Sequence, residues 1–326
     1  MNNNINIVFA SDNLYVPYMG ISIQSIIMNS NQDINYFIYI LDNGISENNR
    51  KRLRTLEKDN VKLHFIDMND YLKNIDTSMF YIYPPYTIST YLRFFLPKIF
   101  PELDRILYID SDTVIEKDVA DLFNCKLDNK YLAAVEDFEV KRIIYADSTI
   151  KDYLHNTLQL QNIDSYFQAG VLLFNLNLMR TINFTEKCFE ILKKIQKPMF
   201  VDQCVLNAVC AKFYKKLDPS WNVEWHLSFQ PSNLKENLKP IDYSRYFESF
   251  NNPFIIHYTS RVKPWNTPDI PLADRFWYYA RQSVFYEEIL YKNMLDITGK
   301  DIDSKISSMP IKAKIKDFLK TRLHKK

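Results

Sequence analysis

The chain has 326 residues, 47% of them hydrophobic, which is enough apolar material for one large domain or two small ones. It holds only 4 glycines and neither a GxGxxG nor a GxxxxGKS/T pattern, so a fold built on a glycine-rich phosphate loop is disfavoured. No run of 18 apolar residues occurs and the start, MNNNINIVFASD, does not read as a signal peptide, so we expect a cytoplasmic protein without a membrane-spanning helix.

Strand-like apolar runs alternate with helical patterns along the first hundred residues. Strands are predicted at 5–10, 36–41 and 61–66, and helices at 18–28, 46–58 and 88–97, the last of them stopped by Pro97.

The alternation continues through the rest of the chain, with strands at 105–110, 131–137 and 254–259, a strand leading into a helix at 170–179, and helices at 184–196, 201–211 and 272–295. This order predicts an α/β fold, in which helices cover both faces of a mostly parallel sheet. Prolines cluster near 268–272. We expect a main domain at 1–268 and a helical C-terminal extension at 269–326.

The buried strand that begins at Arg105 ends abruptly in Asp110-Ser111-Asp112. Two adjacent carboxylates repel each other and are costly to desolvate. A solvated turn with a helix cap would explain them, since Asp and Ser favour turns and caps. A divalent cation that binds a phosphate would explain them equally well, because ligands of open α/β sheets lie beyond the carboxyl ends of the strands. Asp12, Asp137 and His257 are expected at the same edge.

Five segments together resemble glycosyltransferase family 8, the retaining sugar transferases of bacterial lipooligosaccharide synthesis. They are IVFASD (7–12), STYLRFFLP (89–97), LYIDSDTVI (107–115), YFQAGVLLFNL (166–176) with VDQCVLN (201–207), and IIHYTSRVKPW (255–265). A DxD pair alone is common. Its combination with a DQxxLN segment and a downstream HYxxxxKPW is specific, and the resemblance covers about residues 5–266.

The resemblance implies a GT-A fold, a nucleotide-sugar donor, usually a UDP-hexose, and a manganese ion. Asp110, Asp112 and His257 would be the metal ligands. A nitrogen ligand favours Mn²⁺, with Mg²⁺ as the alternative ion. Lys263 would pair with the diphosphate and assist the leaving group.

The same resemblance implies a set of donor-binding residues, Ala10, Asp12, Tyr15, Arg93 and Ser111, with the first three at the uridine and Arg93 near the diphosphate and sugar. Gln203 would lie on the β-face of the donor sugar, and Gln203 and Asp202 would be catalytic residues. Because a glutamine is a poor nucleophile, we expect the acceptor hydroxyl to enter on the face from which UDP leaves.

Three positions depart from the family pattern. Gln168 stands where the family commonly has a sugar-contacting Asn, Ser260 where it has Gly, and Cys204 where it has Asp. Gln168 and Ser260 are still expected to contact the donor. The acceptor is expected to meet Asp137 and loops within 138–166 and 222–250.

Residues 309–326 carry seven Lys/Arg and one Asp, although the whole chain has a net charge of only +2. Apolar residues recur there at helical spacing, so this basic tail is expected to bind an anionic membrane surface, as a peripheral protein on the inner face of the cytoplasmic membrane. A solvated tail is the alternative. Nucleic acid is a poor partner, because the basic charge is confined to the tail.

The predicted activity is transfer of galactose or glucose from UDP-galactose or UDP-glucose to a saccharide acceptor, carried on a lipid, in surface oligosaccharide synthesis. A capsule or glycoprotein acceptor is the alternative within the same chemistry. An inactive sugar-nucleotide-binding protein and a metal-dependent phosphohydrolase are the alternatives from other classes. The phosphohydrolase is disfavoured because a two-metal site would need more His or carboxylate ligands in motifs.

Overall fold

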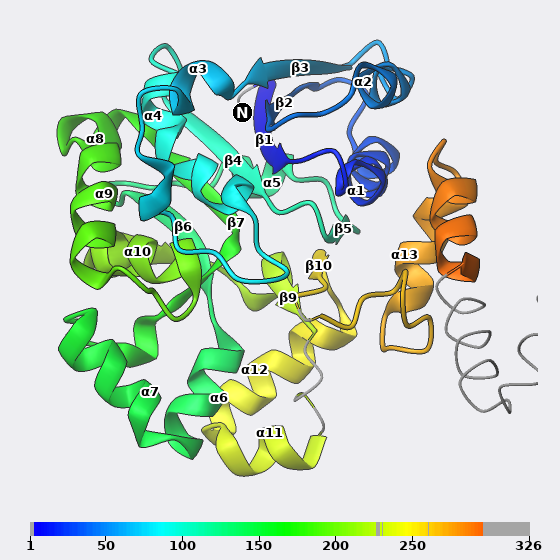
Figure 1. Ribbon diagram of the computed structural model, residues 1–326. Coiled ribbons are helices and arrows are strands. Elements are labelled where there is room, and N and C mark those ends of the chain that lie inside the picture. The colour runs from blue at the N-terminus through cyan, green and yellow to red at the C-terminus, as the bar shows by residue number, and fades with distance from the viewer. Residues whose placement is uncertain (1–2, 226–228, 230, 260, 296–326) are drawn as a thin grey trace, which may run out of the picture.

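The computed structural model describes residues 3–225, 229, 231–259 and 261–295. A seven-stranded sheet lies at its centre in the order β3-β2-β1-β4-β7-β6-β8 (Figure 1). Its strands are β1 (Asn4–Ser11), β2 (Asn35–Asp42), β3 (Val61–Asp67), β4 (Arg105–Ile109), β6 (Leu132–Glu136), β7 (Phe167–Asn175) and β8 (Tyr214–Lys216). Only β7 runs antiparallel to its neighbours, β4 and β6, so the predicted mostly parallel sheet is confirmed.

Helices cover both faces of this sheet, because its strands are apolar on both sides. In β1, Ile7 and Phe9 pack in one core and Val8 packs in the other, as expected when successive side chains point to opposite faces. The first core contains α1 (Val16–Asn29), α2 (Glu47–Arg54) and α5 (Ala120–Phe123), and the second contains α4 (Leu96–Ile99), α8 (Leu176–Thr181), α9 (Phe184–Ile195) and α10 (Val201–Cys210). A short α3 (Asn69–Leu72) follows β3.

Pro97 does not stop the helix that the sequence predicts at 88–97. The chain forms a 3₁₀ helix over Ile88–Phe95 and continues into α4, where Pro97 occupies the first turn. A proline is tolerated there because the first N–H groups of a helix have no partner within the helix. The expected end at Pro97 is therefore wrong, and the helical segment runs to Ile99.

A second sheet of three strands lies beside the first. His257 belongs to this second sheet, so its expected position at the end of a strand of the main sheet is wrong. The second sheet consists of β5 (Thr113–Ile115), β10 (Ile255–His257) and β9 (Val223–Glu224), with β10 in the middle. His257 therefore does not follow a strand of the main sheet. It pairs with Thr113 of the antiparallel strand β5, and this pairing places it next to the Asp-Ser-Asp segment, which directly precedes β5.

The two segments expected as acceptor loops are largely helical. Residues 138–166 contain α6 (Phe138–Ala146), α7 (Ser148–Asp152) and a π-helical turn at Tyr153–Thr157, and residues 222–250 contain α11 (Pro231–Asn237) and most of α12 (Pro240–Asn251). Asp137 caps α6, because its Oδ1 accepts the N–H of Val140 at 2.7 Å. These helices extend the molecule below the main sheet in Figure 1.

The C-terminal segment packs on α1, on the side of the molecule away from α9 (Figure 1). The helix expected at 272–295 is two pieces, α13 (Ala273–Ala280) and a helical stretch at 286–295, separated by a turn. Phe276 and Phe285 belong to the same core as α1. The division at residue 268 stays a prediction, and the basic tail and Ser260 lie outside the described residues. Among the described helices, none combines the length and apolar character that crossing a bilayer requires.

Gly20 in α1 lets this C-terminal segment approach closely. A Cβ added at Gly20 would lie 2.3 Å from Cε2 of Phe285, which is buried. We expect Gly20→Ala to lower the free energy of unfolding by about 1–3 kcal/mol, because the added methyl group overpacks the contact. In a Phe285→Ala background the same change should raise stability by up to about 1 kcal/mol, because alanine is the better helix former. Urea titration of the four proteins of this cycle measures both effects. Equal effects of Gly20→Ala in both backgrounds would contradict the contact.

Candidate functional site

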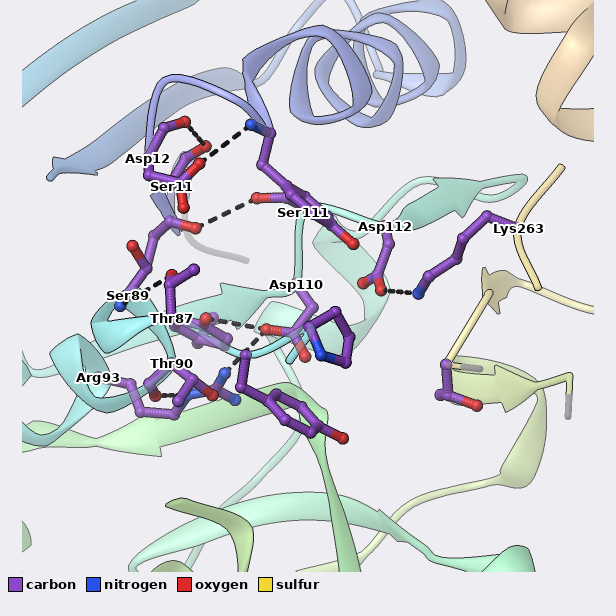
Figure 2. Close-up of a pocket in the computed structure, with 16 residues that line it drawn as sticks. Ser11, Asp12, Thr87, Ser89, Thr90, Arg93, Asp110, Ser111, Asp112 and Lys263 are labelled. Carbon is purple, nitrogen blue, oxygen red and sulfur yellow. Dashed lines mark hydrogen bonds and ion pairs between the residues drawn. The ribbon is translucent and has the colours of Figure 1, made fainter. Parts of the chain in front are cut away.

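The predicted site residues gather where β1 and β4 end and β7 begins. Because β7 is antiparallel to β4, its first residues reach the same edge, and the N–H of Asp110 donates to the carbonyl of Gly170 at 2.8 Å. The small sheet closes the opposite side through the pairing of Thr113 with His257. Figure 2 shows Asp12, Arg93, Asp110, Asp112 and Lys263 converging from four separate segments of the chain.

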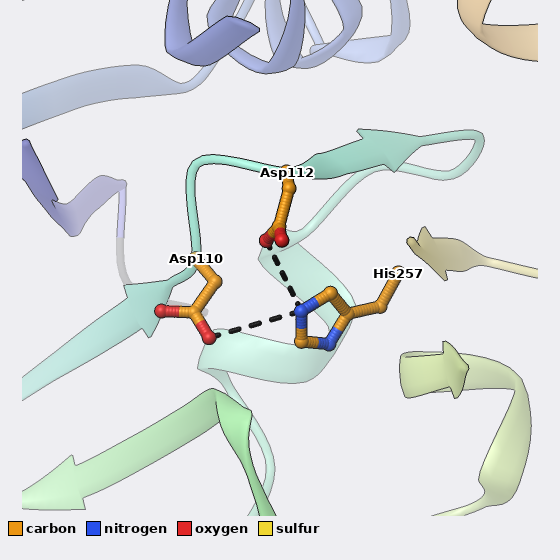
Figure 3. Close-up of side chains that lie close together, drawn as sticks. All are labelled: Asp110, Asp112 and His257. Carbon is orange, nitrogen blue, oxygen red and sulfur yellow. Dashed lines mark hydrogen bonds and ion pairs between the residues drawn. The ribbon is translucent and has the colours of Figure 1, made fainter. Parts of the chain in front are cut away.

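Asp110, Asp112 and His257 form a group whose ligand atoms all lie within 4.8 Å of one another (Figure 3). His257 Nε2 lies 3.1 Å from Asp112 Oδ1 and 3.8 Å from Asp110 Oδ2. Asp110 keeps a quarter of its side chain exposed, so a ligand can reach the group from solvent. Two carboxylates and one imidazole are a donor set that fits a divalent transition ion with positions left for further oxygen ligands.

The positive charge of Lys263 offsets the negative charge of Asp112 on one side of this group. Its Nζ lies 2.5 Å from Asp112 Oδ2 and also donates to the carbonyl of Tyr258. Burial alone would raise the pKa of Asp112, but the ammonium group of Lys263 beside it holds that pKa well below its usual range. Asp112 is therefore ionised at neutral pH and available as a ligand.

Arg93 is buried on the other side and bridges two carboxylates. Its Nη2 lies 2.9 Å from Asp110 Oδ1, its Nε lies 3.1 Å from Asp202 Oδ2, and its guanidinium stands 4.0 Å from the ring centre of Tyr108. Burial raises the pKa of Asp202 to about 6, although Arg93 and a hydrogen bond from Thr90 oppose the shift. Arg93 thus ties the predicted metal ligand to a predicted catalytic residue.

Both ends of the Gln203 amide are engaged. Its Oε1 accepts the N–H of Ala169 at 2.9 Å, and its Nε2 donates to Asp137 Oδ2 at 2.8 Å. Burial raises the pKa of Asp137 to about 6, against the opposing effect of its hydrogen bonds from Val140 and Gln203. These contacts hold the glutamine in one orientation, and its side chain lines a pocket next to Asp110 and Asp112.

The predicted donor-binding residues at the end of β1 line a pocket beside this cluster. Asp12 Oδ1 accepts the N–H groups of Leu14 and Tyr15 at 3.0 and 3.1 Å and so shapes the turn before α1. Ser111 Oγ donates to the carbonyl of Ala10 at 3.2 Å. The Tyr15 ring meets Tyr18 edge to face.

Two adjoining pockets share Arg93, Asp110 and Asp112. The structure brings every described site residue that the sequence predicts to one or both of them. The first also holds Ala10, Asp12, Tyr15, Ser111 and Lys263, and the second also holds Asp137, Gln168, Asp202, Gln203 and His257. Their individual roles stay predictions.

Sequence reasoning missed several residues of the site. Pro85 and Tyr86, from a YPPY stretch at 83–86, line both pockets, and Glu224 lines the second. Two adjacent prolines indicate a stiff loop and could have drawn attention to this stretch. Asn222 contacts His257 from a segment in which no motif marks it.

Comparison with known proteins relates the chain to sugar transferases. The sequence model described as Glycosyl transferase family 8 matches residues 6–268. General stress protein A of Bacillus subtilis is 26% identical over 84% of this chain and 92% of its own length. A lipopolysaccharide 1,3-galactosyltransferase of Salmonella typhimurium is 23% identical over 80% of this chain and 73% of its own length.

A solved structure of the bifunctional glycosyltransferase WbbM in its apo form superposes with a TM-score of 0.78 at 31% identity. The match covers 90% of this chain but only 52% of that protein, so this chain spans about half of its relative. The expected GT-A fold is confirmed by this likeness and by those to other solved glycosyltransferases.

Proposed function

The chain belongs to glycosyltransferase family 8, and from this premise we propose that it moves galactose or glucose from a UDP-sugar to a saccharide acceptor with retention of anomeric configuration. The observation that carries the proposal is the convergence of Asp110, Asp112 and His257 between Lys263 and Arg93. The two carboxylates and the imidazole are suitable ligands for a metal ion, and the two cationic side chains are suitable partners for a diphosphate.

Asp110, Asp112 and His257 would hold a Mn²⁺ ion, or Mg²⁺ in its place. When bound, the ion supplies positive charge next to the diphosphate, where negative charge grows as UDP departs. Lys263 would donate to a diphosphate oxygen, since its Nζ already lies beside Asp112, a carboxylate that would hold the ion. Arg93 would hold Asp110 in place and add positive charge on the sugar side.

The pocket at the end of β1 would take the nucleotide. Ala10 and Asp12 lie at the strand end and Tyr15 offers a ring for stacking on the uracil, while Ser111 stands beside Ala10. Ser260, which follows β10 in the sequence, is proposed to contact the diphosphate. The second pocket, which contains Gln168, Gln203 and Asp137, would hold the donor sugar and the acceptor hydroxyl.

Gln203 and Asp202 would stabilise positive charge at the anomeric carbon without forming a lasting bond. Gln203 Oε1 already accepts a backbone N–H, which withdraws electron density from a weakly basic oxygen, and Asp202 is paired with Arg93. The acceptor hydroxyl would enter from the face that UDP leaves, with the departing phosphate taking its proton.

This course predicts that no glycosyl adduct accumulates on the enzyme. Intact-mass spectrometry of protein mixed with donor and quenched at short times should show the unmodified chain. A hexose mapped by peptide sequencing to Gln203 or Asp202 would contradict the one-face course and indicate a covalent intermediate.

The acceptor is proposed to be a lipid-linked oligosaccharide of the cell surface. The lipopolysaccharide 1,3-galactosyltransferase among its relatives supports a hexose donor and a saccharide acceptor of this type. The basic residues of 309–326 would hold the protein at the anionic inner face of the cytoplasmic membrane, where such acceptors are assembled.

Release of UDP from a panel of UDP-sugars, with Mn²⁺ and with a chelator, tests the central proposal. We expect Mn²⁺-dependent release from UDP-galactose or UDP-glucose. Asp110→Asn and Asp112→Asn should each lower the rate by about 10²-fold or more, because each removes an anionic ligand of the ion.

Asp121→Asn is the matched control, since it removes an exposed carboxylate that pairs with Lys117 away from the site. Its rate should equal that of the unaltered protein. Near-normal rates of UDP release in both site variants would contradict the proposed metal role of the two aspartates. An absence of turnover together with Mn²⁺-dependent UDP binding would point to an inactive binding protein or to a need for acceptor.

Deletion of 309–326 should release the protein from vesicles that contain anionic lipid. Each basic residue near such a surface contributes about 1 kcal/mol, so the loss of seven should abolish detectable binding at physiological salt. Vesicle sedimentation measures this, with neutral vesicles and donor hydrolysis as controls. Unchanged binding after the deletion would show that the tail is not the anchor.

A further inference from the structure

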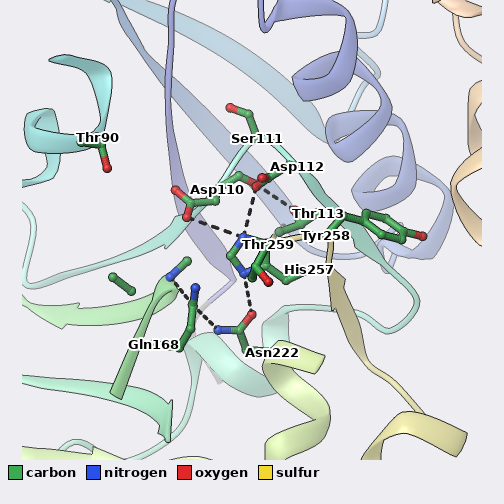
Figure 4. Close-up of polar contacts among 12 residues, drawn as sticks. Thr90, Asp110, Ser111, Asp112, Thr113, Gln168, Asn222, His257, Tyr258 and Thr259 are labelled. Atoms are coloured by element: carbon green, nitrogen blue, oxygen red, sulfur yellow. Dashed lines mark hydrogen bonds and ion pairs between the residues drawn. The ribbon is translucent and has the colours of Figure 1, made fainter. Parts of the chain in front are cut away.

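Two buried amide side chains, Asn222 and Gln168, lie behind His257 of the proposed metal-ligand group (Figure 4). His257 Nδ1 lies 3.1 Å from Asn222 Oδ1, on the side of the ring that faces away from Asp110 and Asp112. Asn222 Nδ2 lies 2.6 Å from Gln168 Oε1. Gln168 Oε1 also accepts the backbone N–H of Gly170.

The backbone N–H of Gly170 sets the direction of every hydrogen bond in this line. A backbone N–H only donates, so the atom of Gln168 that faces it must be the amide oxygen. That oxygen only accepts, so Asn222 must present its NH₂ to Gln168 and its carbonyl oxygen to His257. The imidazole must then carry a proton on Nδ1.

A proton on Nδ1 leaves Nε2 of a neutral ring with its lone pair toward Asp110 and Asp112. A lone pair that faces two carboxylates is unfavourable unless a proton or a metal cation lies between them. We propose that Gln168 and Asn222 are positioning residues that hold His257 in the Nδ1–H tautomer, so that Nε2 is ready to bind a divalent cation.

Gly170 also fixes where the ring lies. A Cβ added there would fall 2.1 Å from His257 Cε1 and 2.5 Å from Nδ1, so the imidazole packs directly against the glycine backbone. Gly170 thus leaves the space that the imidazole occupies, and its N–H orients the amides of Gln168 and Asn222. The glutamine at 168, which departs from the family's usual asparagine, has its side-chain oxygen engaged by Gly170 and Asn222.

This inference rests on the proposed metal role of His257, and not on sugar transfer. Its test is Mn²⁺ binding by the full chain without donor, measured from the electron paramagnetic resonance signal of free Mn²⁺. We expect Gln168→Met and Asn222→Leu to weaken Mn²⁺ binding about 10- to 100-fold, the usual effect of losing a group that orients a metal ligand. Gln168→Glu keeps an acceptor oxygen for Gly170 and Asn222, so it should stay within about threefold of the unaltered protein.

Asn60→Leu is the matched control for loss of a buried amide, because Asn60 bonds the carbonyls of Asn31 and Ile34, which belong to the turn before β2. It should leave Mn²⁺ binding unchanged. Thermal unfolding of each variant checks that the protein is folded. Unaltered Mn²⁺ affinity in Gln168→Met, or an equal loss in Gln168→Met and Gln168→Glu, would overturn the proposal.

The tautomer is measured separately by long-range ¹H–¹⁵N NMR of the histidine rings in alkaline buffer, where an imidazole ordinarily carries one proton. We expect the His257 proton on Nδ1 in the unaltered protein and a shift toward Nε2 in Gln168→Met. A proton on Nε2 in the unaltered protein overturns the proposal without any variant. If the unaltered protein binds no Mn²⁺, the metal role fails, and the NMR spectra still decide whether the line of amides orders the ring.

Discussion

The repulsion between Asp110 and Asp112 at the end of β4 is the constraint on which the rest of the site depends. Two partly buried carboxylates so close together are stable only among cations. Arg93 and Lys263 supply two of them, one on each outer side, and the inner side of the pair faces Nε2 of His257. The charges are thus balanced at the periphery, and the proposed ion would bind between the carboxylates and the imidazole.

Two sheets are needed to build this arrangement. The parallel part of the main sheet brings the ends of β1 and β4 together, and the antiparallel β7 adds its first residues to the same edge. The small sheet then places His257 opposite the aspartates through a short antiparallel pairing of β10 with β5, the strand that directly follows Asp112. The proposed metal ligands are therefore held by backbone pairing on both sides, which is the rigid support that a metal site requires.

Charge and hydrogen bonding continue from this centre in two directions. Arg93 links Asp110 to Asp202, and Asp202 adjoins Gln203, whose amide reaches Asp137 at the start of α6. Behind the histidine, neutral amides lead back to the backbone of β7. Most of these groups are buried, so each partner constrains the next, and a change in one is expected to move its neighbours.

The sequence by itself determined the α/β class, most strand and helix positions, and a part of the residues that gather in the two pockets, because apolar periodicity and the DxD, DQxxLN and HYxxxxKPW patterns are local signals. It did not reveal that His257 belongs to a second sheet, that Pro97 lies inside a helical segment, or that 138–166 and 222–250 are largely helical. Strand pairing and packing decide those features through contacts between residues far apart in the chain. Asn222 is the clearest case: no pattern marks it, and only the fold places it behind His257, where the N–H of Gly170 orders the whole line.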